Sequence, residues 1–329
     1  MKRQFLVFAS AILVSLLGTA TTRAATTAID TIIHDGSTWV TTPNIVGIPG
    51  AVDIETYKGF SEFVAVGLFG ARDYYFDGLN WTFAPMVGAN DYIKIANGYA
   101  GGAPNGVGIF YGLSSSGRID KINNNTAVLS TGVVTGLTNP KAIETYSPFS
   151  GEFLTVSDEG VRDYFNSGAN FIPVSAATDY IELANKGSAS GSFFALGSDG
   201  RVDLIANDGN NNYTTTNILA AGTLTNPKYI ESYDGNNEFV TVSSQGVREY
   251  FFSGGQWQFD LMSASPNYIA VVDNSQEGAS YWALSVVPEP NSVVLISIGL
   301  VGMSVFRSRE RRNQRFCSRQ RSDYAAAPE

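Results

Sequence analysis

The sequence predicts an all-β protein, a six-bladed β-propeller of ~40- to 47-residue blades that closes by pairing its N- and C-terminal segments. Three observations support this prediction. An aromatic residue followed seven positions later by glycine recurs five times, and successive glycines are 40 to 47 residues apart. The intervening segments are short runs of β-branched and aromatic residues, such as EFLTVS, separated by Gly, Asn, Asp and Ser, with no long helical periodicity. A sixth unit is divided between the two ends of the domain.

The five complete units alternate between two kinds. GVRDYFNSGANF (160–171) and GVREYFFSGGQW (246–257) are near copies, and GARDYYFDGLNW (70–81) is a third, so a longer repeat of 86 to 90 residues contains two blades. The aromatic–glycine pairs are Phe63/Gly70, Phe110/Gly117, Phe153/Gly160, Phe193/Gly200 and Phe239/Gly246. The acidic residues that follow each glycine by three positions are Asp73, Asp120, Asp163, Asp203 and Glu249. Because these glycines and carboxylates occur in both kinds of unit, we expect them to be part of the blade itself.

The sixth unit is predicted from two half-repeats. SYWALS (280–285) matches the start of SFFALGS (192–198), and AIDTIIHDGSTWVTTPNIVG (28–47) resembles RIDKINNNTAVLSTGVVTG (118–136), with Asp30 in the place of Asp120. A closed ring explains complementary halves at the two ends of the domain, whereas a linear β-solenoid, the alternative, does not require them. The ring also removes exposed sheet edges. We therefore assign residues 25–287 to the propeller.

The N-terminal segment has the pattern of a secretory signal peptide. Lys2 and Arg3 precede an apolar stretch from Phe5 to Leu17, and small residues continue to Ala24. This order of basic, apolar and small residues predicts export and removal of residues 1–24.

The segment 287–312, VPEPNSVVLISIGLVGMSVFRSRERR, combines a Pro-Glu-Pro step, a 15-residue apolar run and an arginine cluster. The apolar run is shorter than the ~20 residues of a full helical span, and the arginines favour the cytoplasmic side. This segment resembles the PEP-CTERM sorting signal. The resemblance implies a transmembrane sorting helix in 288–312, processing by the membrane protease exosortase, and an inner-membrane precursor that ends at the cell surface or in the extracellular matrix. A plain single-pass anchor is the alternative, and 313–329 is expected to be a disordered basic tail. The residues that carry the signal are Pro288, Glu289, Pro290, Arg307, Arg309, Arg311 and Arg312.

Charge and residue inventory exclude several functions. The chain has 21 basic and 30 acidic residues, of which 3 basic ones lie in 1–24 and 7 basic and 3 acidic ones lie in 291–329. The remaining 11 basic and 27 acidic residues give 25–290 a net charge of −16, which disfavours nucleic acid and anionic lipid as partners. The sole cysteine is Cys317 and the sole histidine is His34. We therefore expect no cofactor, no metal site, no catalytic residues and no enzymatic activity.

Candidate ligand-binding residues occur only in the odd-numbered units. Each has arginine two residues after the glycine, then an acidic residue and tyrosine, and an aromatic residue eleven after the glycine. Arg118 and Arg201 in even units follow the glycine directly, and this one-residue shift predicts the opposite face of the strand. The odd-unit sets are Arg72, Tyr74, Trp81; Arg162, Tyr164, Phe171; and Arg248, Tyr250, Trp257.

Two interpretations of these sets remain open. Aromatic faces and fixed polar groups suit sugar rings, an arrangement similar to lectin propellers of the tachylectin type. Alternatively, the arginines brace neighbouring strands and the aromatic side chains pack between blades. The first strands carry a further polar series, which we expect to border the central channel with mainly negative charge: Glu55, Lys94, Glu144, Glu182 and Glu231.

The leading hypothesis from the sequence is an exported protein that binds exopolysaccharide or another envelope component without catalysis. A structural or adhesive matrix or biofilm scaffold is the alternative. A glycan hydrolase or lyase is a third hypothesis, which would require one indispensable carboxylate pair.

Overall fold

The computed structural model describes residues 26–56, 62–98, 108–123, 127–145, 151–165, 168–186, 191–232, 238–274 and 280–287. Every described residue belongs to Met1–Val287, the first of the two units into which the chain divides. The predicted signal peptide, sorting segment and basic tail lie outside the described residues. Across the described ranges, no helix is long and apolar enough to cross a membrane.

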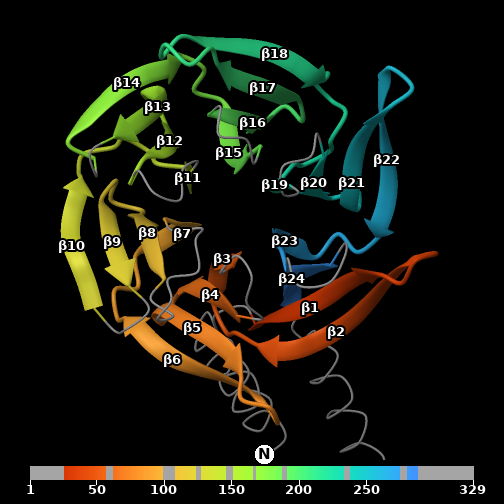
Figure 1. Ribbon diagram of the computed structural model, residues 1–329. Coiled ribbons are helices and arrows are strands. Elements are labelled where there is room, and N and C mark those ends of the chain that lie inside the picture. The colour runs from red at the N-terminus through yellow and green to blue at the C-terminus, as the bar shows by residue number, and fades with distance from the viewer. Residues whose placement is uncertain are drawn as a thin grey trace, which may run out of the picture. The chain divides into compact units, whose positions relative to one another are not determined.

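Six antiparallel sheets of four strands each surround a central axis, which confirms the predicted six-bladed propeller (Figure 1). The innermost strands of successive blades contact one another around the whole ring. We number the blades from 1 to 6 around the ring and list their strands from the axis outward. Blade 1 contains β3 (Ala51–Thr56), β4 (Glu62–Gly67), β5 (Gly70–Phe76) and β6 (Trp81–Val87). Blade 2 contains β7 (Tyr92–Asn97), β8 (Ile109–Ser114), β9 (Ile119–Asn123) and β10 (Ala127–Val134). Blade 3 contains β11 (Ala142–Thr145), β12 (Phe153–Ser157), β13 (Gly160–Phe165) and β14 (Asn170–Ser175).

The remaining blades complete the ring. Blade 4 contains β15 (Tyr180–Asn185), β16 (Ser192–Gly197), β17 (Val202–Asn207) and β18 (Tyr213–Leu219). Blade 5 contains β19 (Tyr229–Ser232), β20 (Glu238–Ser243), β21 (Gly246–Ser253) and β22 (Gln256–Ser263). Blade 6 contains β23 (Tyr268–Asp273), β24 (Ser280–Val287), β1 (Thr26–His34) and β2 (Trp39–Gly47).

Blade 6 closes the ring with both ends of the described chain. Its two inner strands come from the C-terminal side and its two outer strands from the N-terminal side. Strands β1 and β24 pair without interruption from Thr26↔Val287 to Ile33↔Ser280. The division of the sixth repeat is therefore the closure of the propeller, as the sequence predicts.

The hydrophobic core lies between the blades, because each sheet packs both faces against its neighbours. The second strands are covered on both sides and are the most apolar, as expected for doubly buried strands. All five residues of β12 and all six of β16 are buried, whereas the outer strands β14 and β18 are largely exposed.

The recurring glycine has a steric cause. Gly70 and Gly246 begin third strands with φ of +80° and +102°, in the left-handed region that favours glycine. A Cβ atom would lie 1.9 Å from the carbonyl oxygen of Val87 at Gly70, and 2.1 Å from that of Ser263 at Gly246. The glycine thus permits the end of the outer strand to close over the turn that precedes the third strand.

Candidate functional site

The odd blades share an arginine stacked on a phenylalanine at their outer strands. The Cζ atoms of Arg72, Arg162 and Arg248 lie 4.4, 4.6 and 4.5 Å from ring centroids on β6, β14 and β22 respectively. The rings belong to Phe83, Phe171 and Phe259, which are 46%, 49% and 49% exposed. We call these three pairs the Arg–Phe sites. Such cation–π contacts fix the guanidinium plane against the ring.

Each Arg–Phe site rests on an aromatic ladder that runs into an interface between blades. In blade 3, Phe171 packs on Tyr164, Tyr164 stacks on Phe153 with centroids 5.4 Å apart, and Phe153 contacts Tyr111 of blade 2 at 4.7 Å. Blades 1 and 5 repeat this order with the sets Phe83, Tyr74, Phe63, Trp282 and Phe259, Tyr250, Phe239, Phe194. The predicted site tyrosines are therefore buried supports, and the arginines and phenylalanines form the accessible part.

The aromatic residues that follow each glycine by eleven positions, Trp81, Phe171 and Trp257, do not all occupy equivalent positions in the structure. Trp81 lies between blades 1 and 6, 5.4 Å from Phe63 and 5.7 Å from Trp282. Trp257 repeats this position between blades 4 and 5. Phe171 instead pairs with Tyr164 across the strands, as Phe83 pairs with Tyr74. The reason is that the β13–β14 hairpin is two residues shorter than the β5–β6 and β21–β22 hairpins. The strand pairing shows this difference, whereas counting residues from the glycine does not.

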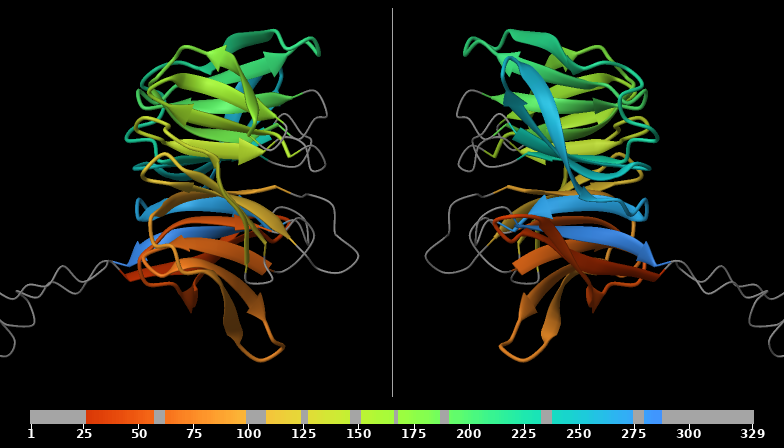
Figure 2. Two further views of the ribbon diagram at one scale, coloured as in Figure 1. Left: turned by 90° about the vertical axis from the view of Figure 1, so that its left-hand side faces the viewer. Right: turned by 90° about the vertical axis from the view of Figure 1, so that its right-hand side faces the viewer.

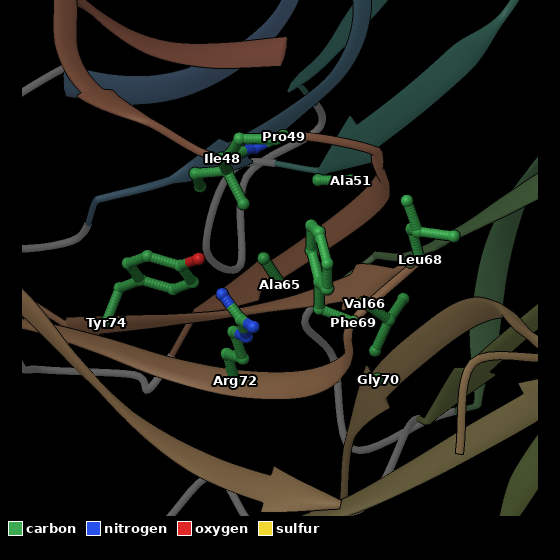
Figure 3. Close-up of a pocket in the computed structure, with 11 residues that line it drawn as sticks. Ile48, Pro49, Ala51, Ala65, Val66, Leu68, Phe69, Gly70, Arg72 and Tyr74 are labelled. Atoms are coloured by element: carbon green, nitrogen blue, oxygen red, sulfur yellow. The ribbon is translucent and has the colours of Figure 1, made fainter. Parts of the chain in front are cut away.

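The Arg–Phe sites of blades 1 and 5 differ in their surroundings. In blade 1, a cavity of about 10 Å³ lies beside Arg72 and Tyr74, and Phe69 covers the other face of the guanidinium with its centroid 4.7 Å from Cζ (Figure 3). That volume holds a single water molecule. In blade 5, Arg248 Nε and the Tyr250 hydroxyl are buried without a hydrogen-bond partner among the described residues. The two sites therefore differ in how the polar atoms beneath the guanidinium are satisfied.

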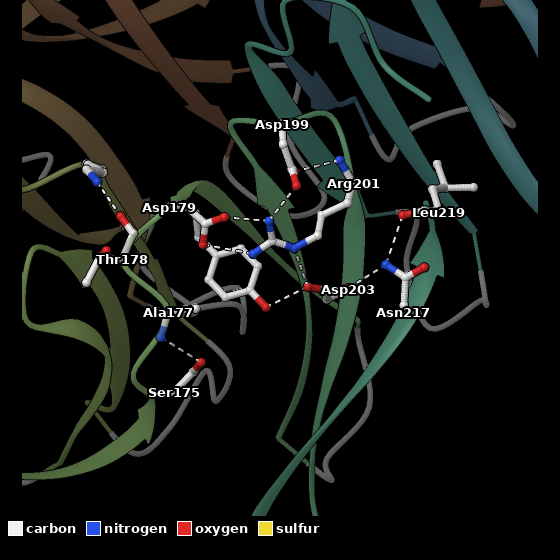
Figure 4. Close-up of polar contacts among 11 residues, drawn as sticks. Ser175, Ala177, Thr178, Asp179, Asp199, Arg201, Asp203, Asn217 and Leu219 are labelled. Atoms are coloured by element: carbon white, nitrogen blue, oxygen red, sulfur yellow. Dashed lines mark hydrogen bonds and ion pairs between the residues drawn. The ribbon is translucent and has the colours of Figure 1, made fainter. Parts of the chain in front are cut away.

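The even blades use arginine differently. Arg201 donates to Asp179, Asp199 and Asp203, and Asp203 also accepts a 2.7 Å hydrogen bond from the hydroxyl of Tyr180 (Figure 4). The hydrogen bonds from Arg201 lower the pKa of Asp179. Arg118 of blade 2 repeats the arrangement with Asp120 and Asp91, 2.9 and 3.2 Å away. These two arginines are structural braces.

The predicted opposite orientation of the even and odd arginines is wrong. Arg201 lies over Tyr180, which packs toward blade 3, and Arg162 lies over Phe171, beside Tyr164, which packs toward blade 2. Both arginines thus face the preceding blade. Two residues separate the paired ends of β12 and β13, whereas three separate Gly197 from Arg201. The longer turn of the even blades cancels the one-residue shift in the sequence.

The channel-lining series forms two layers. In blades 1 to 5 the first layer consists of the residues that pair opposite the fourth position before the recurring glycine: Asp53, Lys94, Ala142, Glu182 and Tyr229. In blade 6, Ala270 takes the corresponding position opposite Leu284. Two positions further along, about 6.6 Å away, Glu55, Glu144 and Glu231 occupy the odd blades. Their carboxylates therefore form a second, separate layer.

Lys94 links the first layer across the channel. Its Nζ donates to Glu182, lies 3.4 Å from Asp53 Oδ1, and lies 4.3 Å from the centroid of Tyr229. Asp53 and Glu182 are buried, and burial raises the pKa of Glu182 to about 7 against the opposing effect of Lys94. One ammonium shared by two buried carboxylates makes this cluster take up a proton near neutral pH.

The remaining predicted residues are outside these sites. Pro288, Glu289, Pro290 and the four arginines of the sorting signal lie outside the described residues. His34 packs edge-on against Trp39 at the β1–β2 turn, with centroids 5.1 Å apart. Among the residues that the structure describes, no group of three or more His, Cys, Asp or Glu side chains is arranged to hold a metal ion.

The fold and the repeated sites define a six-bladed β-propeller with alternating blade interfaces. No protein-family model matches the chain, and no curated protein matches it. Many solved chains, 796 in all, resemble it, so the fold alone does not indicate a function. One is from the crystal structure of a nidogen/laminin complex, with a TM-score of 0.54 and 12% sequence identity over 71% of this chain and 93% of that one. The similarity is one of fold.

Proposed function

We propose that this protein is an exported, non-catalytic β-propeller that binds a polysaccharide of the cell envelope or extracellular matrix through its three Arg–Phe sites. The observation that carries the proposal is the repetition of a half-exposed phenylalanine and a stacked arginine on three alternate blades. Packing alone requires no exposed aromatic ring, whereas exposed aromatic residues with fixed hydrogen-bond donors are typical of binding surfaces.

The positions of the buried carboxylates favour binding over glycan hydrolysis or elimination. A glycan hydrolase needs two carboxyl groups that face a substrate. Asp120 and Asp203 are instead held by tyrosine hydroxyls and arginines within their blades. Asp53 and Glu182 are held by Lys94. These carboxylates are engaged in the scaffold.

Export and sorting rest on the two terminal patterns. The signal-peptide pattern of 1–24 and the PEP-CTERM resemblance of 288–312 support an inner-membrane precursor that exosortase processes before the protein reaches the surface or matrix. Mass spectrometry of the secreted protein from an exosortase-positive host tests this. We expect the mature N-terminus near residue 25 and a new C-terminus near Pro288, and replacement of Pro288-Glu289-Pro290 by alanines should prevent C-terminal processing. An unprocessed cytoplasmic chain would contradict the proposal.

Binding is tested with residues 25–287, which contain every strand of the ring, on a panel of bacterial exopolysaccharides. We expect saturable binding, and a loss of at least about tenfold when Arg72, Arg162 and Arg248 are all changed to glutamine, the size of effect typical of interface hot spots. Lys121→Gln, which removes one positive charge from the third strand of blade 2, is the control for a charge outside the Arg–Phe sites and should leave affinity unchanged. A folded domain that binds no glycan would refute the function.

A structural or adhesive scaffold is the second candidate, supported by a different surface. The tip of the β5–β6 hairpin carries Leu79, 85% exposed, and Phe76, 50% exposed, and the hairpin projects from the ring (Figure 2). Loss of matrix adhesion in Leu79→Ser and Phe76→Ser variants, without any glycan binding by the native domain, would favour this function.

A further inference from the structure

The arginines of the Arg–Phe sites have no acidic partner, in contrast to those of the even blades. Arg118 and Arg201 each form ion pairs with at least two aspartates. Among the described residues, no carboxylate lies within ion-pair distance of Arg72, Arg162 or Arg248. Acidic residues are abundant in this domain, so three arginines without a counter-ion at equivalent positions are a repeated and specific feature of the odd blades.

The stacking geometry determines which part of each site a ligand meets. The guanidinium lies over one face of the phenylalanine, and the buried tyrosine packs against the same ring at 5.5–5.6 Å. The arginine therefore covers one face of the phenylalanine ring, and a sugar cannot stack on that face. What the site presents is a planar cation, held in place, with hydrogen-bond donors along its edge.

We propose that the ligand of these sites is an acidic polysaccharide recognised through its carboxylate groups. This inference rests on the proposed function and specifies its ligand. A planar guanidinium pairs bidentately with a planar carboxylate, which a hydroxyl of a neutral sugar cannot match.

The acidic domain repels a polyanion at long range, and physiological ionic strength reduces this repulsion. Charges more than about 8 Å from the ligand are screened there, whereas direct contacts with the guanidinium persist. Three sites on alternate blades also allow one polymer with regularly spaced carboxylates to engage more than one site, which increases the apparent affinity. Short uronate oligomers should consequently bind more weakly than the polymer.

The test compares alginate with the same polymer after reduction of its carboxyl groups to primary alcohols. Residues 25–287 should bind alginate, with at least tenfold weaker binding of the reduced polymer. The triple Arg→Gln variant should lose alginate binding by at least tenfold, and the triple Arg→Lys variant should fall between it and the native domain, since lysine keeps the charge and loses the bidentate geometry. Circular dichroism and melting temperature establish that both variants are folded.

The outcomes separate the inference from the function on which it rests. Equal binding of native and reduced alginate, or binding of a neutral glycan alone, would overturn the carboxylate assignment and leave the binding function standing. Dextran sulfate that binds as tightly as alginate would also overturn it, because a guanidinium pairs bidentately with other oxyanions too, and equal binding would show that the sites do not select carboxylates. Failure of the folded domain to bind any of these glycans would refute both.

Discussion

Lys94 of blade 2 donates a hydrogen bond across the central channel to Glu182 of blade 4, and blade 3 has only Ala142 at the equivalent register position. The link joins non-neighbouring blades, and it leaves two buried carboxylates dependent on a single ammonium group.

Replacement of Lys94 should therefore destabilise the domain strongly. Lys94→Met leaves Asp53 and Glu182 buried without a cation, and removal of one partner from a buried ion pair costs about 3–5 kcal/mol. Urea unfolding at pH 7.5 measures the loss. The triple variant Lys94→Met, Asp53→Asn, Glu182→Gln removes all three charges and should recover most of the stability. Equal instability of the single and triple variants would contradict this explanation.

Glu249 should make the domain less stable as pH rises. Burial, with Glu238 and Asp260 nearby, raises the pKa of Glu249 to about 7 from an ordinary value of 4.5. The folded state thus binds more protons than the unfolded state between these values, so its contribution to stability is present below pH 4.5 and is lost as pH rises through 7. Melting curves from pH 4.5 to 8 should show a smaller decline for Glu249→Gln.

The expected difference at pH 8 is an increase of about 2 °C in the melting temperature of Glu249→Gln, since 1 kcal/mol corresponds to ~2–4 °C in a domain of this size. Glu159→Gln is the contrasting control. Hydrogen bonds from Ser157 and Thr138 outweigh desolvation and lower the pKa of Glu159 to about 2, so its contribution to stability is lost as pH falls. A parallel decline in native protein and Glu249→Gln would exclude Glu249 as the source.

The tyrosine–aspartate hydrogen bonds of the even blades offer an internal comparison. Tyr268 donates to Asp30 at 2.9 Å, and Tyr180 donates to Asp203 at 2.7 Å. Asp203 also accepts hydrogen bonds from Arg201 and Asn217, whereas Asp30 also accepts one from the backbone N–H of Asn44. Tyr268→Phe should therefore cost about 2–3 kcal/mol and Tyr180→Phe about 1 kcal/mol. Thermal unfolding of the two variants measures the difference, and equal losses would show that Arg201 does not compensate.

The recurring glycine Gly246 should tolerate alanine less well than Gly209, a glycine outside the repeat pattern that has free space around it. At Gly246, a Cβ would lie 2.1 Å from the Ser263 carbonyl oxygen, whereas at Gly209, with a similar positive φ of +85°, no atom lies within 4 Å. Gly209→Ala should cost only the backbone strain of about 1–2 kcal/mol. Gly246→Ala should cost at least ~2 kcal/mol more, because the clash adds to the strain. Similar denaturation midpoints for the two variants would contradict the steric explanation.

The sequence allowed the fold to be predicted more fully than the site, for a physical reason. The glycine and the buried aromatic residue recur because each blade needs the same turn and core, so the ring and its divided sixth blade follow from the repeats. Side-chain neighbours depend instead on strand register, and turns of different length change that register. The shorter β13–β14 hairpin placed Phe171 opposite Tyr164, and Phe83 and Phe259 were missed because the count began at the glycine.

The dependence of side-chain contacts on turn length and strand register also explains why the orientation of the even-blade arginines and the contacts in the channel could not be predicted. One extra turn residue in the even blades reverses the orientation that strand alternation predicts for Arg201. The contact between Lys94 and Glu182 depends on the arrangement of three successive blades, so no local pattern in the sequence indicates it. Prediction of the cross-strand pairs would have identified the Arg–Phe sites, because each phenylalanine lies opposite a site tyrosine.

The pairing of β1 with β24 has a consequence for biosynthesis. The first strand of the ring to be synthesised, β1, pairs with the last one, β24. Until β24 is made, the β1–β2 hairpin lacks the two inner strands of its sheet, and the buried side chains Ile29 and Ile32 are incompletely covered. A chain that stops early, or loses either end to a protease, lacks part of blade 6 and leaves the ring open. Only a domain that retains both ends can therefore complete blade 6 and cover the hydrophobic side chains at its faces.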